Sequence, residues 1–234
     1  PVIFHPAEVV YGADGVTSFA IEALDVNSQT LEKVGQARLK LAGRHNVLNA
    51  TAALFATIME VAGRPRILAK HVYDALESFE GTGRRLEERG TVGGVTVIDD
   101  YAHHPTAIRE VLWALSVYRP ERPLWAVWQP HTFSRTSALF ADYATAFSDA
   151  DHVLVTDVFA AREQPPTGQT VSGFSAQVAA AIQHPDVTHT PSLDDAVRYL
   201  LAHVTGEAVI VIMSAGDAPK IGEAFLRERE GGAS

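Results

Sequence analysis

The feature of this sequence that most constrains its fold is the regular alternation, from residue 86 onward, of short apolar segments with segments of helical spacing. Gly, Pro or polar residues bound the apolar segments VTVI, LWAVW, HVLV and AVIVIM. Strands that are apolar along their whole length are typical of a sheet covered on both faces, and their alternation with helices favours parallel pairing. The pattern predicts an α/β fold with a Rossmann-like, mostly parallel sheet flanked by helices.

Turn and cap signals place the connections of this sheet. The glycine pair at residues 93–94 predicts a hairpin that leads into the first parallel strand. Pro105 suits the first position of a helix, and Ser192 with Asp195 resembles a capping box. We expect the segment 137–147 to form one helix.

The first third of the chain follows another pattern. VIFHPAEVVYG is strand-like, and residues 11–43 alternate as antiparallel strands. Helical spacing follows over residues 44–62, with Gly63 in the position of a C-terminal cap, and a second helix comes after it. The apolar residues at helical spacing include Val47, Leu48, Leu54 and Phe55.

A short, basic, glycine-containing stretch, GTGRR at residues 81–85, marks the change of pattern. We therefore expect two domains, residues 1–79 and residues 80–234. The first would hold the antiparallel strands and two helices, and the second the parallel sheet.

Composition excludes several classes of protein. The formal charge of -9 argues against a nucleic-acid partner, which needs basic residues to neutralise phosphates. The chain has no cysteine, which excludes disulfides and thiolate metal sites and suits the cytoplasm, where we expect this protein. Its longest apolar stretches, such as residues 208–213, fall far short of the ~20 residues that span a bilayer, so we expect no membrane partner.

Polar and titratable residues gather where the predicted parallel strands end. In an open α/β sheet, ligands bind in the crevice outside the carboxyl ends of the strands. The first strand is followed by the heptapeptide DDYAHHP at residues 99–105. The later strands are followed by Gln129, His131 and Arg135, by Asp157, and by Ser214, Gly216 and Asp217.

Each of these residues also has a plainer explanation. Asp99 or Asp100 can cap the next helix, and His131 with Arg135 can belong to a solvated helix face. A metal-dependent hydrolase is a further alternative, but adjacent histidines on a helix point about 100° apart and the motif HExxH is absent. We therefore predict no metal site.

Four segments in the same order resemble the Mur ligases of peptidoglycan synthesis: GRHNVLNATAA, FEGTGRRLEERG, VTVIDDYAHHPTAI and QPHTFSRT. The resemblance runs from about residue 15 to the C-terminus and is closest to the members that add L-alanine to UDP-N-acetylmuramate. The DDYAHHP segment is also similar to the family member that reattaches recycled murein tripeptide, which stays an alternative.

The resemblance implies a domain assignment. Residues 1–79 would be the C-terminal part of the central ATP-binding domain, and residues 80–234 the C-terminal Rossmann-like domain. The sequence contains no Gly-Lys-Ser/Thr and begins at Pro1 without methionine. We therefore expect upstream domains of the same enzyme as partners, ATP and Mg²⁺ bound mostly through them, and an isolated chain that is inactive. A module that only binds nucleotide and amino acid is the alternative from another class.

The resemblance also implies residue roles on the nucleotide side. Asn46 and Asn49 would meet the adenine, Arg85 would reach phosphate or ribose as a binding and catalytic residue, Asp100 would accept from the ribose hydroxyls, and Tyr101 would lie against the adenine.

On the amine side, the resemblance makes His103 the catalytic residue, placed near the acyl phosphate and the incoming amine. His104 would contact substrate. His131 and Arg135 would hold the carboxylate of the amino acid, for which a guanidinium is suited.

Overall fold

A computed structural model describes three stretches of the chain, residues 1–12, 15–60 and 65–232. Within them, the side chains of residues 58–60 and 65–70 are left undescribed. The chain divides into two compact units, which are Pro1–Gly81 with Val117–Arg119 and Thr82–Ser116 with Pro120–Ser234. Each unit encloses buried apolar clusters of its own.

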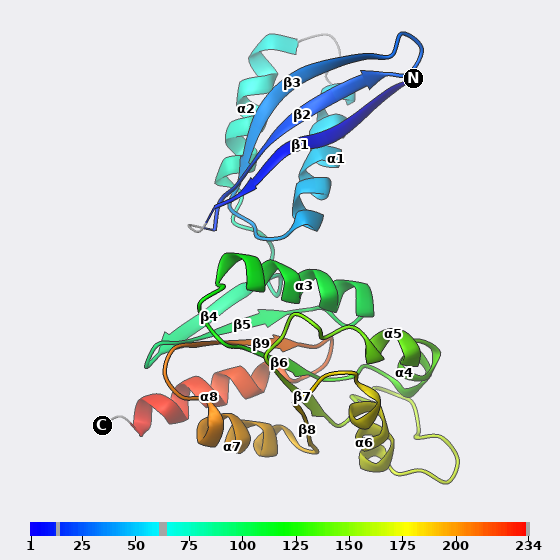
Figure 1. The fold of residues 1–234 in the computed structure, drawn as a ribbon, viewed down its shortest axis with the longest axis vertical. Helices are drawn as coiled ribbons and strands as arrows, with labels where there is room; N and C mark the ends of the chain where they lie inside the picture. Colours follow the sequence, from blue (N-terminus) through cyan, green and yellow to red (C-terminus); the bar gives the residue numbers. More distant parts are fainter. Residues whose placement is uncertain (13–14, 61–64, 233–234) are drawn as a thin grey trace. The chain divides into compact units, whose positions relative to one another are not determined.

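The smaller unit is a three-stranded antiparallel sheet with two helices (Figure 1). Its strands β1 (Val2–Tyr11), β2 (Thr17–Asp25) and β3 (Thr30–Leu39) pair in the order β1-β2-β3. The helices α1 (Arg44–Glu60) and α2 (Pro65–Ser78) follow. The expected antiparallel strands and two helices are confirmed.

The core of the smaller unit joins one face of the sheet to one face of α1. Its buried members are Phe19, Ile21, Ala37, Leu39, Val47, Ala50 and Leu54. Leu48 and Phe55 belong to the same helix but are 59% and 36% exposed. Each follows a buried residue by one position, which turns its side chain about 100° away from the core. Gly63, the expected cap, lies outside the described residues.

The larger unit is built on a six-stranded sheet (Figure 1). Its strand order is β4-β5-β9-β6-β7-β8, and all neighbours are parallel except β4 and β5. The strands are β4 (Glu87–Val92), β5 (Val95–Asp100), β6 (Leu124–Trp128), β7 (His152–Thr156), β8 (Val187–Thr190) and β9 (Ala208–Met213). This confirms the expected mostly parallel α/β sheet.

Helices cover both faces of this sheet, as the wholly apolar strands predict (Figure 1). One buried cluster joins the sheet to α3 (Pro105–Tyr118), α4 (Phe133–Ala138), α5 (Phe140–Ala144) and α6 (Val171–Ala181). The other joins it to α7 (Leu193–His203) and α8 (Pro219–Gly231).

The strand that comes last in the sequence, β9, lies between β5 and β6. Its register aligns Met213 with Asp100 on one side and with Trp128 on the other. The three strands therefore end at the same level, and the residues that follow them begin at one edge. We call this edge, where Tyr101, Gln129 and Ser214 emerge, the rim.

Most connections match their sequence signals. Gly93 and Gly94 have positive φ values of 54° and 81° and form the tight turn between β4 and β5. Pro105 opens α3, and the capping box of α7 is present. The single helix expected over residues 137–147 is wrong. The helical stretch begins earlier and breaks at Leu139, whose φ of -111° and ψ of 19° depart from helical geometry.

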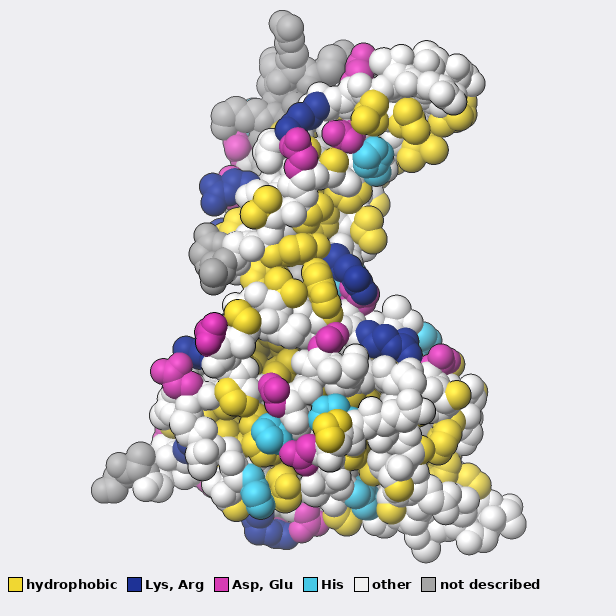
Figure 2. Space-filling model, viewed as in Figure 1, with side chains coloured by type: hydrophobic (Ala, Val, Ile, Leu, Met, Phe, Trp, Pro, Cys, Tyr) yellow, Lys and Arg dark blue, Asp and Glu magenta, His cyan; other side chains and the backbone are white. Residues whose placement is uncertain are grey.

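None of the described helices is long and apolar enough to cross a membrane. Figure 2 shows acidic and histidine side chains lying among apolar ones on the visible face of the larger unit. Charge is dispersed over that face and does not form a basic stripe.

Candidate functional site

The rim is built by backbone pairing that continues past the ends of the strands. Ser214 N donates to Asp100 O over 3.1 Å, and Gln129 N donates to Met213 O over 3.1 Å. The loops after β5, β9 and β6 are thereby held side by side. Side chains from three distant parts of the sequence meet at one place as a result.

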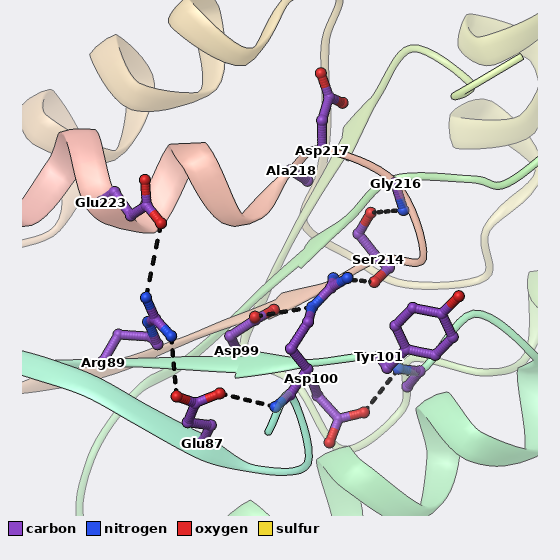
Figure 3. Close-up of polar contacts among 12 residues, drawn as sticks. Glu87, Arg89, Asp99, Asp100, Tyr101, Ser214, Gly216, Asp217, Ala218 and Glu223 are labelled. Atoms are coloured by element: carbon purple, nitrogen blue, oxygen red, sulfur yellow. Dashed lines mark hydrogen bonds and ion pairs between the residues drawn. The ribbon is translucent and has the colours of Figure 1, made fainter. Parts of the chain in front are cut away.

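Arg84 ties the segment before β4 to this rim, and its two partners, Asp99 and Ser214, are labelled in Figure 3. Its Nε donates to Asp99 Oδ2 over 3.0 Å, and its Nη2 donates to the carbonyl of Ser214. Asp99 is 2% exposed, and its Oδ1 is buried without a hydrogen-bond partner among the described residues. Burial raises the pKa of Asp99, and the guanidinium of Arg84 opposes that rise. A buried carboxylate at this position depends on its arginine partner.

Asp100 holds the backbone of two loops. Its Oδ2 accepts from Leu86 N over 2.8 Å and its Oδ1 from Ala102 N over 2.7 Å. Its side chain is buried, which raises its pKa, while the two backbone donors oppose the rise. The carboxylate predicted to meet the ribose is therefore engaged with protein groups, and the ribose contact stays a prediction.

Tyr101 lies beside two arginines. The guanidinium carbon of Arg84 is 4.9 Å from the centre of the Tyr101 ring, and that of Arg85 is 5.8 Å from it. Tyr101 is half-buried and Arg85 is exposed. An aromatic face next to cationic groups has the chemistry to contact a base and a phosphate.

Gln129 fixes the loop between β9 and α8. Its Oε1 accepts from Ser214 Oγ over 2.7 Å and from the backbone N–H of Asp217 and Ala218. Its Nε2 donates to Asp217 Oδ1 over 2.9 Å. A Cβ on Gly216 would lie 2.5 Å from Gln129 Oε1 and 2.6 Å from Phe159 Cγ, so only glycine fits there.

His103 is held so that one ring nitrogen is available as an acceptor. Its Nδ1 lies 2.9 Å from the carbonyl of Tyr101, and a carbonyl can only accept. Nδ1 therefore carries the proton, and Nε2 is unprotonated in the neutral ring. Burial lowers the pKa of His103, which favours that neutral form at pH 7.

His131 has the opposite arrangement. Nη1 of Arg135 lies 3.2 Å from His131 Nδ1, and a guanidinium can only donate, so the proton of the neutral ring sits on Nε2. Burial lowers the pKa of His131, with a smaller contribution from Arg135. The rings of His103 and His131 are 6.0 Å apart, between centroids. An acceptor, a donor and a guanidinium thus lie close together, which suits an amino group next to a carboxylate.

Comparison with known proteins identifies the family. A family model described as "Mur ligase, glutamate ligase domain" matches residues 84–216, more than half of the chain. The chain belongs to the Mur ligase family.

Individual relatives agree with this assignment. This Mur ligase chain is 37% identical over 232 residues to a UDP-N-acetylmuramate–L-alanine ligase of Desulfatibacillum aliphaticivorans, covering 94% of the chain and 49% of that relative. The chain thus spans about half the length of the curated relatives it matches.

Two solved structures have a similar fold. The UDP-N-acetylmuramate-alanine ligase of Thermotoga maritima has a TM-score of 0.75 at 24% identity, over 99% of this chain and 46% of that one. A murein peptide ligase of Psychrobacter arcticus has a TM-score of 0.60 at 26% identity, over 97% of this chain and 44% of that one.

Three further predicted site residues are placed as follows. His104 is exposed, and its Nδ1 accepts from Thr106 N over 3.3 Å at the start of α3, as a capping residue would. Asn46 and Asn49 belong to α1 of the smaller unit. Asn46 Nδ2 donates to Ala42 O over 2.8 Å, and Asn49 is exposed.

Sequence reasoning missed Arg84 and Glu163. Arg84 stands next to Arg85, and nothing in the stretch GTGRR tells which one turns inward. Its φ of 58° directs the chain so that Arg84 meets Asp99. Glu163 accepts two hydrogen bonds from Ser134, a contact 29 residues apart that follows only from β6 and β7 being neighbours.

No group of three or more His, Cys, Asp or Glu side chains is arranged to hold a metal ion within the described residues. Asp99 and Asp100 in particular are engaged by Arg84 and by backbone donors. The carboxylates at this edge therefore do not fit the role of Mg²⁺ ligands in this arrangement.

Proposed function

We propose that this chain is part of a cytoplasmic, ATP-dependent ligase that joins L-alanine to UDP-N-acetylmuramate in peptidoglycan synthesis. The observation that carries the proposal is the convergence of His103, His131 and Arg135, which come from the loops after β5 and β6. The name of the curated relative that is 37% identical supports the choice of substrates.

We further propose that residues 1–79 form the C-terminal part of the central ATP-binding domain and residues 80–234 the C-terminal domain. The share of the curated relative that is matched, 49%, supports this assignment. The 234 residues contain no Gly-Lys-Ser/Thr, the loop that cradles ATP phosphates. Turnover would then need upstream domains of the same enzyme.

The proposed reaction has two steps. The carboxylate of UDP-N-acetylmuramate takes the terminal phosphoryl group of ATP, which turns a poor leaving oxygen into phosphate. The amino group of L-alanine then attacks the carbonyl carbon. A C–N bond forms, the C–O bond to phosphate breaks, phosphate leaves, and the nitrogen loses a proton.

His103 and its neighbours have roles that follow from their hydrogen bonds. We assign to His103 Nε2 the acceptance of the amine proton, because Nδ1 donates to Tyr101 O and the lowered pKa keeps the ring neutral. Arg135 and His131 Nε2–H would hold the carboxylate of L-alanine, which directs its amino group toward His103.

On the nucleotide side, Arg85 and Tyr101 suit a phosphate and a base by their chemistry and exposure. We retain Asn46, Asn49 and Asp100 as proposed ATP contacts and His104 as a proposed substrate contact. We assign no Mg²⁺ ligand to the rim. We propose that the ligands of Mg²⁺ belong to the upstream domains of the same enzyme.

A second candidate is the ligase that reattaches recycled murein tripeptide. The 26% identity to the murein peptide ligase of Psychrobacter arcticus, over 97% of this chain, favours it as the runner-up. The bond formed is the same, but the incoming amine belongs to a peptide and not to a single amino acid.

Phosphate release tests these proposals. It would be measured with ATP, UDP-N-acetylmuramate and either L-alanine or murein tripeptide. The two proteins are the 234-residue chain alone and its fusion to the amino-terminal half of the Desulfatibacillum aliphaticivorans ligase. We expect no release by the chain alone and L-alanine-dependent release by the fusion.

Each other outcome has a definite meaning. Turnover by the chain alone contradicts the need for upstream domains, and tripeptide-dependent release favours the second candidate. If L-alanine shifts the NMR signals of His103 and His131 but the fusion releases no phosphate, a binding-only module is favoured.

A further inference from the structure

The loop that carries His131 and leads into α4, where Arg135 lies, is joined to the loop that follows β7. Phe159 N donates to Pro130 O over 2.8 Å, and Thr132 N donates to Phe159 O over 3.0 Å. The ring of Phe159 stacks on His131 with centroids 5.7 Å apart. The second loop thus supports the first on the side of β7.

Glu163 closes this junction. Its Oε2 accepts from Ser134 N over 2.9 Å, and its Oε1 accepts from Ser134 Oγ over 2.6 Å. Ser134 is the second residue of α4 and directly precedes Arg135. The chain turns into α4 at Thr132, whose φ of 62° is unusual for a residue with a Cβ. A carboxylate bound to the first turn therefore holds the helix start in a conformation that its own backbone does not favour.

We propose that Glu163 is a positioning residue for the amino-acid pocket: through Ser134 it fixes the first turn of α4 and so aims Arg135 and His131 at the carboxylate of the amino acid. The proposal rests on the proposed function for the identity of that ligand. Glu163 is hydrogen-bonded to Ser134, which directly precedes Arg135, so it positions the two side chains through the loop.

The charge of Glu163 also affects the pKa of His131. His131 is surrounded by Arg135 from α4, by His103 from the loop after β5, and by Glu163 from the loop after β7. Arg135 and His103 lower the pKa of His131, and Glu163 raises it. Removal of the carboxylate charge should therefore lower the pKa of His131.

The chain offers a matched control in the capping box of α7. Asp195 Oδ2 accepts from Ser192 N over 3.1 Å and from Ser192 Oγ over 2.6 Å. Both carboxylates are partly exposed, and contacts with serine lower the pKa of each. Asp195 lies on the helix layer of α7 and α8, on the other face of the sheet from α4. The same loss of a carboxylate charge can thus be made at Glu163, near His131, and at Asp195, on the other face of the sheet.

The experiment compares Glu163→Gln, Glu163→Asp and Asp195→Asn in the fusion described above. We expect Glu163→Gln to raise KM for L-alanine about tenfold, since displacement of a positioning group by ~1 Å costs up to ~10²-fold. KM for ATP should stay within about twofold of the wild type. Glu163→Asp, which keeps the charge, should recover part of the loss, and Asp195→Asn should change neither constant. An unchanged KM for L-alanine in Glu163→Gln, or an equal rise in both constants, would overturn the proposal.

A second readout separates this inference from the proposed function. In the 234-residue chain, the His131 ring is titrated by NMR with and without Glu163→Gln. We expect a lower His131 pKa in the variant and no change in Asp195→Asn. If L-alanine is not a substrate but the Arg135 and His131 side-chain NMR signals move in Glu163→Gln and not in Asp195→Asn, the proposed substrate fails and the positioning role stands. Arg135 and His131 signals that stay at their wild-type positions in Glu163→Gln contradict the positioning role whatever the substrate is.

Discussion

His103 illustrates how a single backbone contact decides what a side chain can do. The Nδ1 of His103 donates to the carbonyl of Tyr101, and the carbonyl of His103 accepts from Tyr143 Oη over 2.6 Å. Ring and backbone are thus both held. The sequence could indicate that a histidine at this position is near the chemistry, through the segment DDYAHHP. It could not tell His103 from His104, because only the path of the chain into α3 turns one inward and leaves the other exposed.

Replacement of His103 tests the proton-acceptor role. In the fusion, we expect His103→Gln to lower kcat by ~10²-fold to ~10⁴-fold, the range typical of a lost general base. KM for ATP should change little. His203→Gln is the control because His203 is exposed at the end of α7, on the other face of the sheet, and its kcat should stay near the wild type. Equal losses in the two variants would contradict the assignment.

The lowered pKa values of His103 and His131 predict how stability depends on pH. A histidine whose pKa is lower in the folded state than in the unfolded state, where it is ~6.5, binds fewer protons when folded. The free energy of unfolding should therefore fall as pH drops below ~6.5 and level off below the folded pKa values. Urea denaturation of the chain between pH 7.5 and pH 5, compared with the His103→Gln and His131→Gln double variant, measures this effect. A double variant with an unchanged pH slope would contradict it.

Arg84, which lies just before β4, is hydrogen-bonded to Asp99 in β5 and to Ser214 directly after β9. Arg84→Ala leaves the carboxylate of Asp99 buried without its partner, and we expect a loss of about 2 kcal/mol in the free energy of unfolding. Arg84 is partly exposed, so the loss should be smaller than for a fully buried pair. Arg198→Ala removes an exposed ion pair on α7 and should have little effect. Chemical denaturation of the two variants provides the comparison.

At the scale of elements, apolar runs and cap signals predicted the strands and most helices. They did not predict the order of the strands in the sheet. Nothing in AVIVIM distinguishes an edge strand from a central one except that it is apolar throughout. The break at Leu139 also had no signal, since Leu139 and Phe140 continue a helical spacing. Both features are set by packing between distant segments, which local propensity does not encode.

The loop between β9 and α8 gives a prediction at this scale. Gly216→Ala would place a Cβ 2.5 Å from Gln129 Oε1, so the network around that amide must shift. We expect a loss of about 1 to 3 kcal/mol in the free energy of unfolding, the usual range for overpacking. Gly231→Ala near the end of α8 meets open space and is the control. Thermal denaturation should show a large shift for the first variant and almost none for the second.

At the scale of the whole molecule, the described residues form two units with separate cores. Leu54 is buried in the cluster of the smaller unit, and Ile210 in a cluster of the larger unit. Leu54→Ala and Ile210→Ala each remove apolar contacts worth about 2 to 5 kcal/mol. We expect calorimetry to resolve two transitions, each lowered by only one of the variants. A single transition that both variants lower equally would contradict independent units.

The central place of β9 also bears on synthesis of the chain. Residues 95–128 supply β5 and β6, yet these strands have no direct partner in each other, because residues 208–213 must lie between them. On a ribosome, the backbone N–H and C=O groups along the β9-facing edges of both strands stay unpaired until about eighty further residues have been translated. The nascent polypeptide is therefore most in need of a chaperone during that interval, and the order of translation makes the middle of the sheet its last part to close.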